Sequence, residues 1–184
     1  MNRNKIKSKI LTALLTGSIS IGVLSGMVTP ASAGTSVNIQ AKPTTVNMTV
    51  PSTMAVVFNE DGTNTLPTNF SVTNNSAIAG VSLVKIDVDA GSTGWNFCQS
   101  TVDLKTRPAD TKEIKFTAGK SGVSKLVSPS SEKGTSASAS FASGQISIPS
   151  KGSETLAFSV ERTAFKQAIS SSKAFDMTLT FDFN

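Results

Sequence analysis

The chain contains no histidine and no tyrosine, and it has only one cysteine and one tryptophan among its 184 residues. The absence of histidine removes the most common general base, the most common zinc ligand and the Ser-His-acid triad together. The single cysteine, Cys98, cannot form an intramolecular disulfide, so packing alone must hold the fold. These absences exclude triad hydrolysis and disulfide-stapled scaffolds, and they favour a binding or structural role.

Two pairs of carboxylates and one Ser-Lys pair remain as candidate catalytic groups. The carboxylate pairs are Asp87 with Asp89 and Glu60 with Asp61. Both pairs follow strand patterns, in turns where acidic residues usually serve solvation and turn geometry rather than acid–base catalysis. The pair Ser121 and Lys125 lacks any surrounding motif, and serine is common throughout the chain. We therefore expect a protein that is not an enzyme and that needs no cofactor.

The first 33 residues have the pattern of a secretory signal peptide. Four basic residues lie within residues 1–9, an apolar stretch spans about residues 10–28, and Ala31-Ser32-Ala33 forms a small-x-small cleavage site. Thr, Ser and Gly residues interrupt the apolar stretch, which makes it a poor membrane span. We expect a mature chain that starts at Gly34. Because neither a lipoprotein cysteine nor a C-terminal apolar anchor is found, we expect it to be secreted or held noncovalently at the cell surface.

Removal of this leader would leave a nearly neutral chain. The sequence has seventeen Lys and Arg residues against twelve Asp and Glu residues, and four of the basic residues lie in the leader. The thirteen that remain are scattered singly, so no basic stripe for phosphates or anionic lipids is indicated unless folding brings them together. We expect no nucleic-acid partner and no integral membrane anchor.

Alternation of apolar and polar residues with a period of two runs through residues 34–184. It is clearest near the end of the chain, where polar residues separate five large apolar ones: Phe175, Met177, Leu179, Phe181 and Phe183. Further strands are expected at 37–39, 46–50, 54–58, 70–73, 81–88, 101–105, 113–117, 123–127, 145–148 and 155–160. In the strand at 81–88, strict alternation predicts Val84 and Ile86 on one face and Leu83 and Lys85 on the other.

This pattern predicts an all-β fold. About ten short strands and one short helix, over residues 161–170, favour an antiparallel β-sandwich of immunoglobulin-like or jelly-roll layout, with a closed barrel as the alternative. Residues 34–184 suffice for a single domain with one core. The segment within 118–153 is rich in Ser, Gly and Lys, and we expect it to be a mobile excursion between strands of that domain.

Trp95 and Phe97 form the candidate ligand platform. They are two residues apart, so on a strand they share one face, which suits an exposed sugar-binding platform or a place in the core. The core is favoured because this is the only tryptophan, and the neighbouring Cys98 is expected to be a buried thiol. The segment 87–91 opens like a calcium loop but lacks the bidentate glutamate of an EF-hand, so a turn is the better interpretation and no metal site is expected.

The segment VNMTVPSTMAVVFNEDGTNTLPTNFSVTNNS, residues 46–76, combines a Thr-Val-Pro strand, an acidic-Gly turn and an Asn-Asn-Ser turn, and the strand AGVSLVKIDVDAG follows it. In this order it resembles secreted cell-surface β-sandwich domains of Firmicutes. With the Phe-rich terminal strand it is also weakly similar to the exported biofilm-fibre protein family of bacilli, although that family's larger insertions have no counterpart here. The resemblance covers residues 46–91 and 155–183. It rests on turn residues, so no functional residue is carried over.

Two functions in different classes follow. The first is a non-enzymatic secreted or cell-surface structural or interaction protein of a Gram-positive bacterium, a component of an extracellular matrix or surface fibre that self-assembles through its terminal strands. Those strands are the N-terminal arm 34–41 and the strand-exchange segment 175–183, because exposed strand edges pair readily between chains. The alternative is a secreted carbohydrate- or cell-wall-binding module built on Trp95. The expected partners are accordingly another copy, a surface protein or a glycan. Pairing of both terminal strands within their own sandwich would argue against exchange.

Overall fold

The computed structural model describes residues 15–19, 33–37, 46–169 and 171–184, which belong to two units, residues 1–45 and 46–184. In the first unit, β1 (Leu15–Ile19) pairs antiparallel with β2 (Ala33–Val37). The predicted cleavage site after Ala33 lies at the start of β2, so β1 belongs to the predicted leader. The remaining residues of the predicted leader and residues 38–41 of the N-terminal arm lie outside the described residues.

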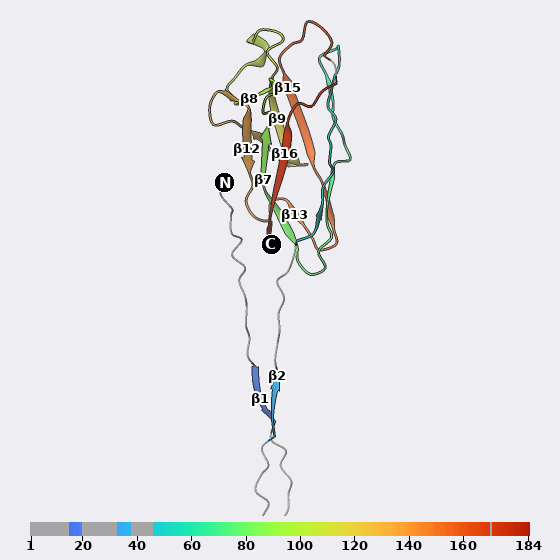
Figure 1. Ribbon diagram of the computed structural model, residues 1–184, viewed down its shortest axis with the longest axis vertical. Coiled ribbons are helices and arrows are strands. Elements are labelled where there is room, and N and C mark those ends of the chain that lie inside the picture. The colour runs from blue at the N-terminus through green and yellow to red at the C-terminus, as the bar shows by residue number, and fades with distance from the viewer. Residues whose placement is uncertain (1–14, 20–32, 38–45, 170) are drawn as a thin grey trace, which may run out of the picture. The chain divides into compact units, whose positions relative to one another are not determined.

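The second unit contains a sheet built around one long central strand. The strand β7 (Val81–Asp89) pairs along its whole length with β16 (Asp176–Phe183). The strands β12 (Ser136–Ser140) and β13 (Ser147–Ile148) pair with the two halves of β7, so both occupy its other edge. All of these pairings are antiparallel, and Figure 1 shows β12, β7 and β16 side by side.

A second sheet is centred on β9 (Glu113–Lys120). On one edge β9 pairs antiparallel with β15 (Ala157–Arg162), and on the other it pairs antiparallel with β10 (Val123–Val127) and parallel with β8 (Asn96–Cys98). The smaller elements are β3 (Met48–Thr49), β4 (Val57–Phe58), β5 (Asn64–Thr65), β6 (Ser71–Asn74), the 3₁₀ turn η1 (Leu104–Thr106), β11 (Lys133–Gly134) and β14 (Ser153–Thr155). Of these, β3 and β14 flank β6, β4 pairs with β5, and β11 extends β8.

The two main sheets share one hydrophobic core. Ile86 and Val88 of β7 are buried from one sheet, and Ile114 and Phe116 of β9 from the other, in a single cluster of apolar side chains. Burial of alternate residues on each strand is the signature of sheets that are covered on one face. The prediction of an all-β, β-sandwich-like fold made of antiparallel sheets is therefore confirmed.

Strict alternation along β7 is wrong at one point. Lys85 lies opposite Thr180, whereas Leu83 lies opposite Phe181, so Val84 is an extra residue on β7 and forms a β-bulge. Because a bulge moves the following residues to the other face, Leu83 and Ile86 are both fully buried although they are three residues apart. The sequence pattern alone placed them on opposite faces.

The predicted helix over 161–170 is not formed in its described residues, 161–169. The strand β15 continues to Arg162, and the backbone beyond it bonds to neighbouring segments. The Thr163 N–H donates to the Glu113 carbonyl at 3.0 Å, and the Ala164 carbonyl accepts from the Asp110 N–H at 2.8 Å. A helix this short is marginal in water, so these tertiary hydrogen bonds decide the conformation.

The segment 118–153 is not an excursion between strands. It contains the end of β9 and all of β10, β11, β12 and β13. In β12 the alternation of Ser and Ala is a strand pattern: Ala137 and Ala139 are buried in the core, and the serines face outward. The strand expected at 101–105 is also wrong, because Asp103 caps the 3₁₀ turn η1 by accepting the Lys105 N–H at 3.0 Å.

Candidate functional site

Trp95 and Phe97 lie inside the core rather than on the surface. Trp95 is 4% exposed and Phe97 is fully buried. The Trp95 ring lies 5.8 Å from the Phe58 ring and 5.9 Å from the Phe165 ring, measured between centroids. A sugar ring needs an accessible aromatic face to stack on, and neither residue offers one. Trp95 and Phe97 are therefore core residues and not an exposed ligand platform.

The strand-exchange segment is part of its own chain's sheet. Phe175 packs against the Phe97 and Phe116 rings, each at 5.2 Å between centroids. In β16, Met177, Leu179 and Phe181 are half-buried against the core, and Phe183 is 43% exposed. The strand β16 is therefore paired with β7 of its own chain. Only the edge of β16 that faces away from β7 is available to a partner.

The direction of the backbone groups follows from the pairing of β7. The Ala90 N–H donates to Thr135 at 2.8 Å, and the Leu83 N–H donates to Ile146 at 3.0 Å, on the side of β12 and β13. Alternate residues of an antiparallel strand direct their N–H and C=O groups to opposite edges. The backbone N–H and C=O groups of Asp87 are therefore directed to Thr178, its partner on β16. Those of Leu83 are directed away from its β16 partner, Phe181.

By the same alternation, three residues of β16 direct their backbone groups to the outer edge: Met177, Leu179 and Phe181. No second strand pairs with β16 among the residues that the structure describes. The next residue of this series, Phe183, has its N–H bonded to the Asp182 carboxylate at 2.8 Å rather than to a strand. The strand β16 is therefore the open edge of its sheet.

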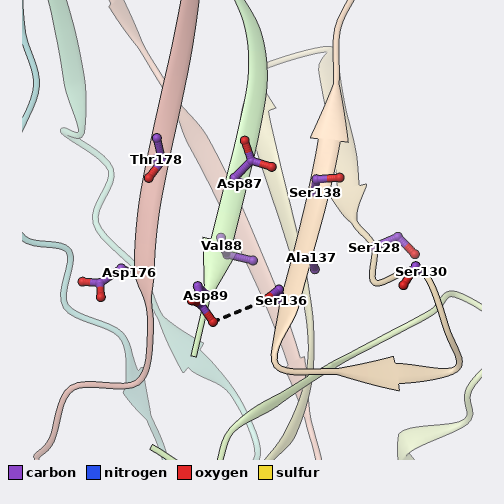
Figure 2. A pocket seen from close by; sticks show the side chains of 10 residues that line it. All are labelled: Asp87, Val88, Asp89, Ser128, Ser130, Ser136, Ala137, Ser138, Asp176 and Thr178. Atoms are coloured by element: carbon purple, nitrogen blue, oxygen red, sulfur yellow. Dashed lines mark hydrogen bonds between the residues drawn. The ribbon is translucent and has the colours of Figure 1, made fainter. Parts of the chain in front are cut away.

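The outer surface of this sheet carries short polar side chains from three neighbouring strands, which we call the polar face. In register across β16, β7 and β12 it consists of Asp176, Asp89 and Ser136, then Thr178, Asp87 and Ser138, then Thr180, Lys85 and Ser140. Figure 2 shows the first two of these rows on adjacent ribbons, with Ser128 and Ser130 beside them. Neighbouring strands lie about 4.8 Å apart, so the first two rows present closely spaced oxygen atoms, and the third places the Lys85 ammonium between two hydroxyls.

A shallow depression of about 390 Å³ lies on the polar face. Its lining consists of Asp87, Val88, Asp89, Ser128, Ser130, Ser136, Ala137, Ser138, Asp176 and Thr178. The Asp89 carboxylate accepts the Gly91 N–H at 2.9 Å and the Ser136 hydroxyl at 3.2 Å. Asp87 pairs with Lys85 at 2.7 Å. The strand β7 runs to Asp89, so Asp87 and Asp89 lie in a strand rather than in a turn, and the Asp89 contact with Gly91 holds the turn that follows. No metal-holding group of three acidic, His or Cys side chains exists in the described part of the chain.

The other candidate catalytic pairs have structural contacts instead. Asp61 accepts hydrogen bonds from the Thr63 hydroxyl and the Thr63 N–H, which lowers the pKa of this fully exposed carboxyl below its usual value. Lys125 donates to the Ser140 carbonyl at 2.6 Å and lies over the Phe141 ring, so it is engaged away from Ser121. These contacts hold turns and strand ends.

A buried carboxylate that the sequence analysis did not single out lies at the start of β9. Glu113 is 2% exposed and is bonded to Lys133 Nζ at 2.9 Å and to Arg107 Nε at 3.4 Å. Arg107 also pairs with Glu132. Arg107, Glu113 and Lys133 come from three different segments of the chain, so no local pattern marks them as a cluster. The one sequence signal is a lone acidic residue at the start of an apolar strand.

Cys98 lies beside this carboxylate. Its Sγ is 3.9 Å from Glu113 Oε2 and its side chain is fully buried. Burial, and then the negative charge of Glu113, raise the pKa of the Cys98 thiol above its ordinary value. The expectation of a buried thiol is confirmed, and the raised pKa favours the unreactive neutral form at neutral pH.

No protein-family model, no curated protein and no solved structure matches this chain. Among the described residues there is no helix with the length and apolar character that a membrane crossing requires. The described residues define an all-β, sandwich-like domain in which the outer edge of β16 is open and the outer face of the β7 sheet is polar.

Proposed function

We propose that this protein is a secreted or cell-surface structural protein of a Gram-positive bacterium that self-associates through its strands, as a component of an extracellular matrix or surface fibre. The leader pattern in residues 1–33 supports export. In the described residues, Asp61, Asp87, Asp89 and Lys125 make contacts that hold turns and strands. The observation that carries the proposal is the open edge of β16, since an unpaired strand edge is a template for another chain.

The N-terminal arm gives a second reason. Cleavage after Ala33 would remove all of β1, the strand that pairs with β2. In the cleaved chain, residues 34–37 would then have lost the strand with which they pair in the precursor. A freed strand with unpaired N–H and C=O groups gains hydrogen bonds by joining another sheet edge. Export would therefore couple to assembly.

The test is light scattering and electron microscopy of purified residues 34–184 over a range of concentrations and times. We expect discrete oligomers or filaments whose mass rises with concentration. A variant that lacks residues 34–41 separates the two terminal strands: reduced assembly assigns a role to the N-terminal arm, and unchanged assembly leaves the edge of β16 as the contact. A monomer under all conditions contradicts the proposed function.

The depression on the polar face favours a second candidate function, binding of a glycan. Hydroxyl and carboxylate oxygens in register can exchange hydrogen bonds with sugar hydroxyls, a role that the buried Trp95 cannot fill. We expect Asp87→Ala to weaken retention on cell-wall polysaccharide about tenfold, since a hydrogen bond to a charged group contributes about 1.5–3 kcal/mol. Asp182→Ala, outside the depression, is the control. Equal retention of the two variants argues against this function.

A further inference from the structure

We propose that two copies of this chain join by antiparallel pairing of their β16 strands, with Leu179 of each copy at the two-fold axis. The inference rests on the proposed self-association and specifies its contact. Each copy would contribute one edge strand, so that the two sheets centred on β7 would become a single continuous sheet. The same surface on both copies makes this an isologous contact.

The absence of edge protection is the first argument. Sheet edges in soluble proteins are usually blocked by Lys, Pro, a bulge or a covering segment. The strand β16 contains neither Lys nor Pro, and its charged residues, Asp176 and Asp182, stand near its two ends. The extra residue of the local bulge belongs to β7, so β16 itself continues as an eight-residue strand.

The edge of β15 in the other sheet differs in this respect. The Asn64 side chain donates to the Val160 carbonyl at 2.5 Å, and the Arg162 guanidinium donates to the Asn59 carbonyl at 3.1 Å. The hairpin of β4 and β5 thus covers that edge. On the opposite side of the sandwich, a bridge between Ser128 and Ser138 joins β12 to the end of β10. Among the described main-sheet edges, the long edge of β16 is the one without such a cover.

The register follows from the backbone. The outward N–H and C=O groups of Leu179 would pair with those of Leu179 in the second copy, and Met177 would pair with Phe181 of the second copy. These residues are separated by two along the strand, as the hydrogen-bonded pairs of an antiparallel ladder require. With the centre at Leu179, residues 176–182 of the two copies pair; a centre at Met177 or at Phe181 pairs a shorter length of β16.

The apolar and threonine side chains are self-complementary in this register, whereas Asp176 stands opposite Asp182 of the second copy at each end of the paired length, and these like charges oppose the contact at low ionic strength. On the core side, the half-buried Met177, Leu179 and Phe181 of one copy meet the same set of the second copy, which covers apolar surface that β16 now leaves partly exposed. On the outer side, Thr178 stands opposite Thr180 of the second copy, so the two polar faces continue into one another. No polar side chain is forced into the joint core.

Cysteine pairing between two variants tests this register directly. Thr178 and Thr180 would form a non-hydrogen-bonded pair, whose Cα atoms lie about 4.5 Å apart. That spacing is within the range that a disulfide spans, about 4.4–6.8 Å. Thr178→Cys and Thr180→Cys are each exposed single changes on the polar face, and the native Cys98 is fully buried. We expect an oxidised mixture of the two variants to form at least about tenfold more disulfide-linked dimer than either variant alone.

The matched control is a mixture of Ser138→Cys and Ser140→Cys, exposed positions of β12 in the same sheet. Crosslinking of Thr178→Cys or Thr180→Cys with itself, or equal crosslinking of the β12 mixture, would overturn the proposed register. Light scattering of the unmodified chain is read in parallel. Association without the specific crosslink refutes the β16 contact and leaves self-association standing, whereas a persistent monomer refutes both.

Discussion

Replacement of Trp95 by alanine is expected to lower the free energy of unfolding by about 3–5 kcal/mol, the usual cost of removing a large aromatic side chain from a core. The ring is 4% exposed and contacts the Phe58 and Phe165 rings, so its removal leaves a cavity between the β4–β5 hairpin and the segment after β15. Urea unfolding followed by circular dichroism measures the loss, because the variant has no tryptophan fluorescence.

Ile78→Ala is the control for this experiment. Ile78 is 80% exposed, and truncation of an exposed side chain changes stability by only about 0.5 kcal/mol. The opposite result, a Trp95→Ala variant with the stability of the unmodified chain and reduced glycan retention, would restore the platform interpretation and show that the Trp95 ring is reached by ligands.

Removal of both cations that face Glu113 is expected to be similarly costly. In a chain with Arg107→Ala and Lys133→Ala together, the Glu113 carboxylate, which is 2% exposed in the unmodified chain, would lose both of its ion-pair partners. Breaking a fully buried ion pair costs about 3–5 kcal/mol, because an uncompensated charge stays out of water. Since Lys133 and Arg107 are 52% and 29% exposed, we expect about 3 kcal/mol, the lower end of that range. Urea unfolding at neutral pH measures the change.

Addition of Glu113→Gln to that double variant provides the discriminating control. Glutamine keeps the shape of the side chain and removes its charge, so we expect it to recover most of the lost stability. If the triple variant is as unstable as the double variant, the lost stability comes from the missing packing of the Arg107 and Lys133 methylene groups. The unpaired charge of Glu113 would then not be the cause.

Local sequence patterns predicted several strands closely. The segment 123–127 is β10, 81–88 is β7 without its last residue, and the alternation at 175–183 is Phe175 followed by β16. These segments were predictable because one face of each strand is buried, and burial selects apolar residues at every second position. The same rule applied to Ser136–Ser140 would have identified β12, but alanine is a weak apolar signal and the surrounding serines suggested a loop.

Other features depend on contacts between distant segments. The helix expected after Arg162 is replaced by hydrogen bonds to Glu113 and Asp110, which no local pattern contains. The bulge at Val84 is visible only in the pairing of β7 with β16, a strand about ninety residues further along the chain. The cluster around Glu113 likewise joins three segments. Propensity and periodicity reflect only a residue's neighbours along the chain. The missing helix, the bulge and the Glu113 cluster depend on neighbours in space, so sequence patterns could not predict them.

The sequence by itself determined the class of this protein: period-two alternation without disulfides or long helices specifies antiparallel sheets closed over one core, and the lack of histidine excludes triad chemistry. Only the tertiary structure decided which side chains are accessible. It placed Trp95 in the core, aligned the polar face from β16, β7 and β12, and left the edge of β16 open. Strand order is set by packing between residues far apart in the chain, so an alternating pattern predicts a strand but not whether that strand lies at an edge.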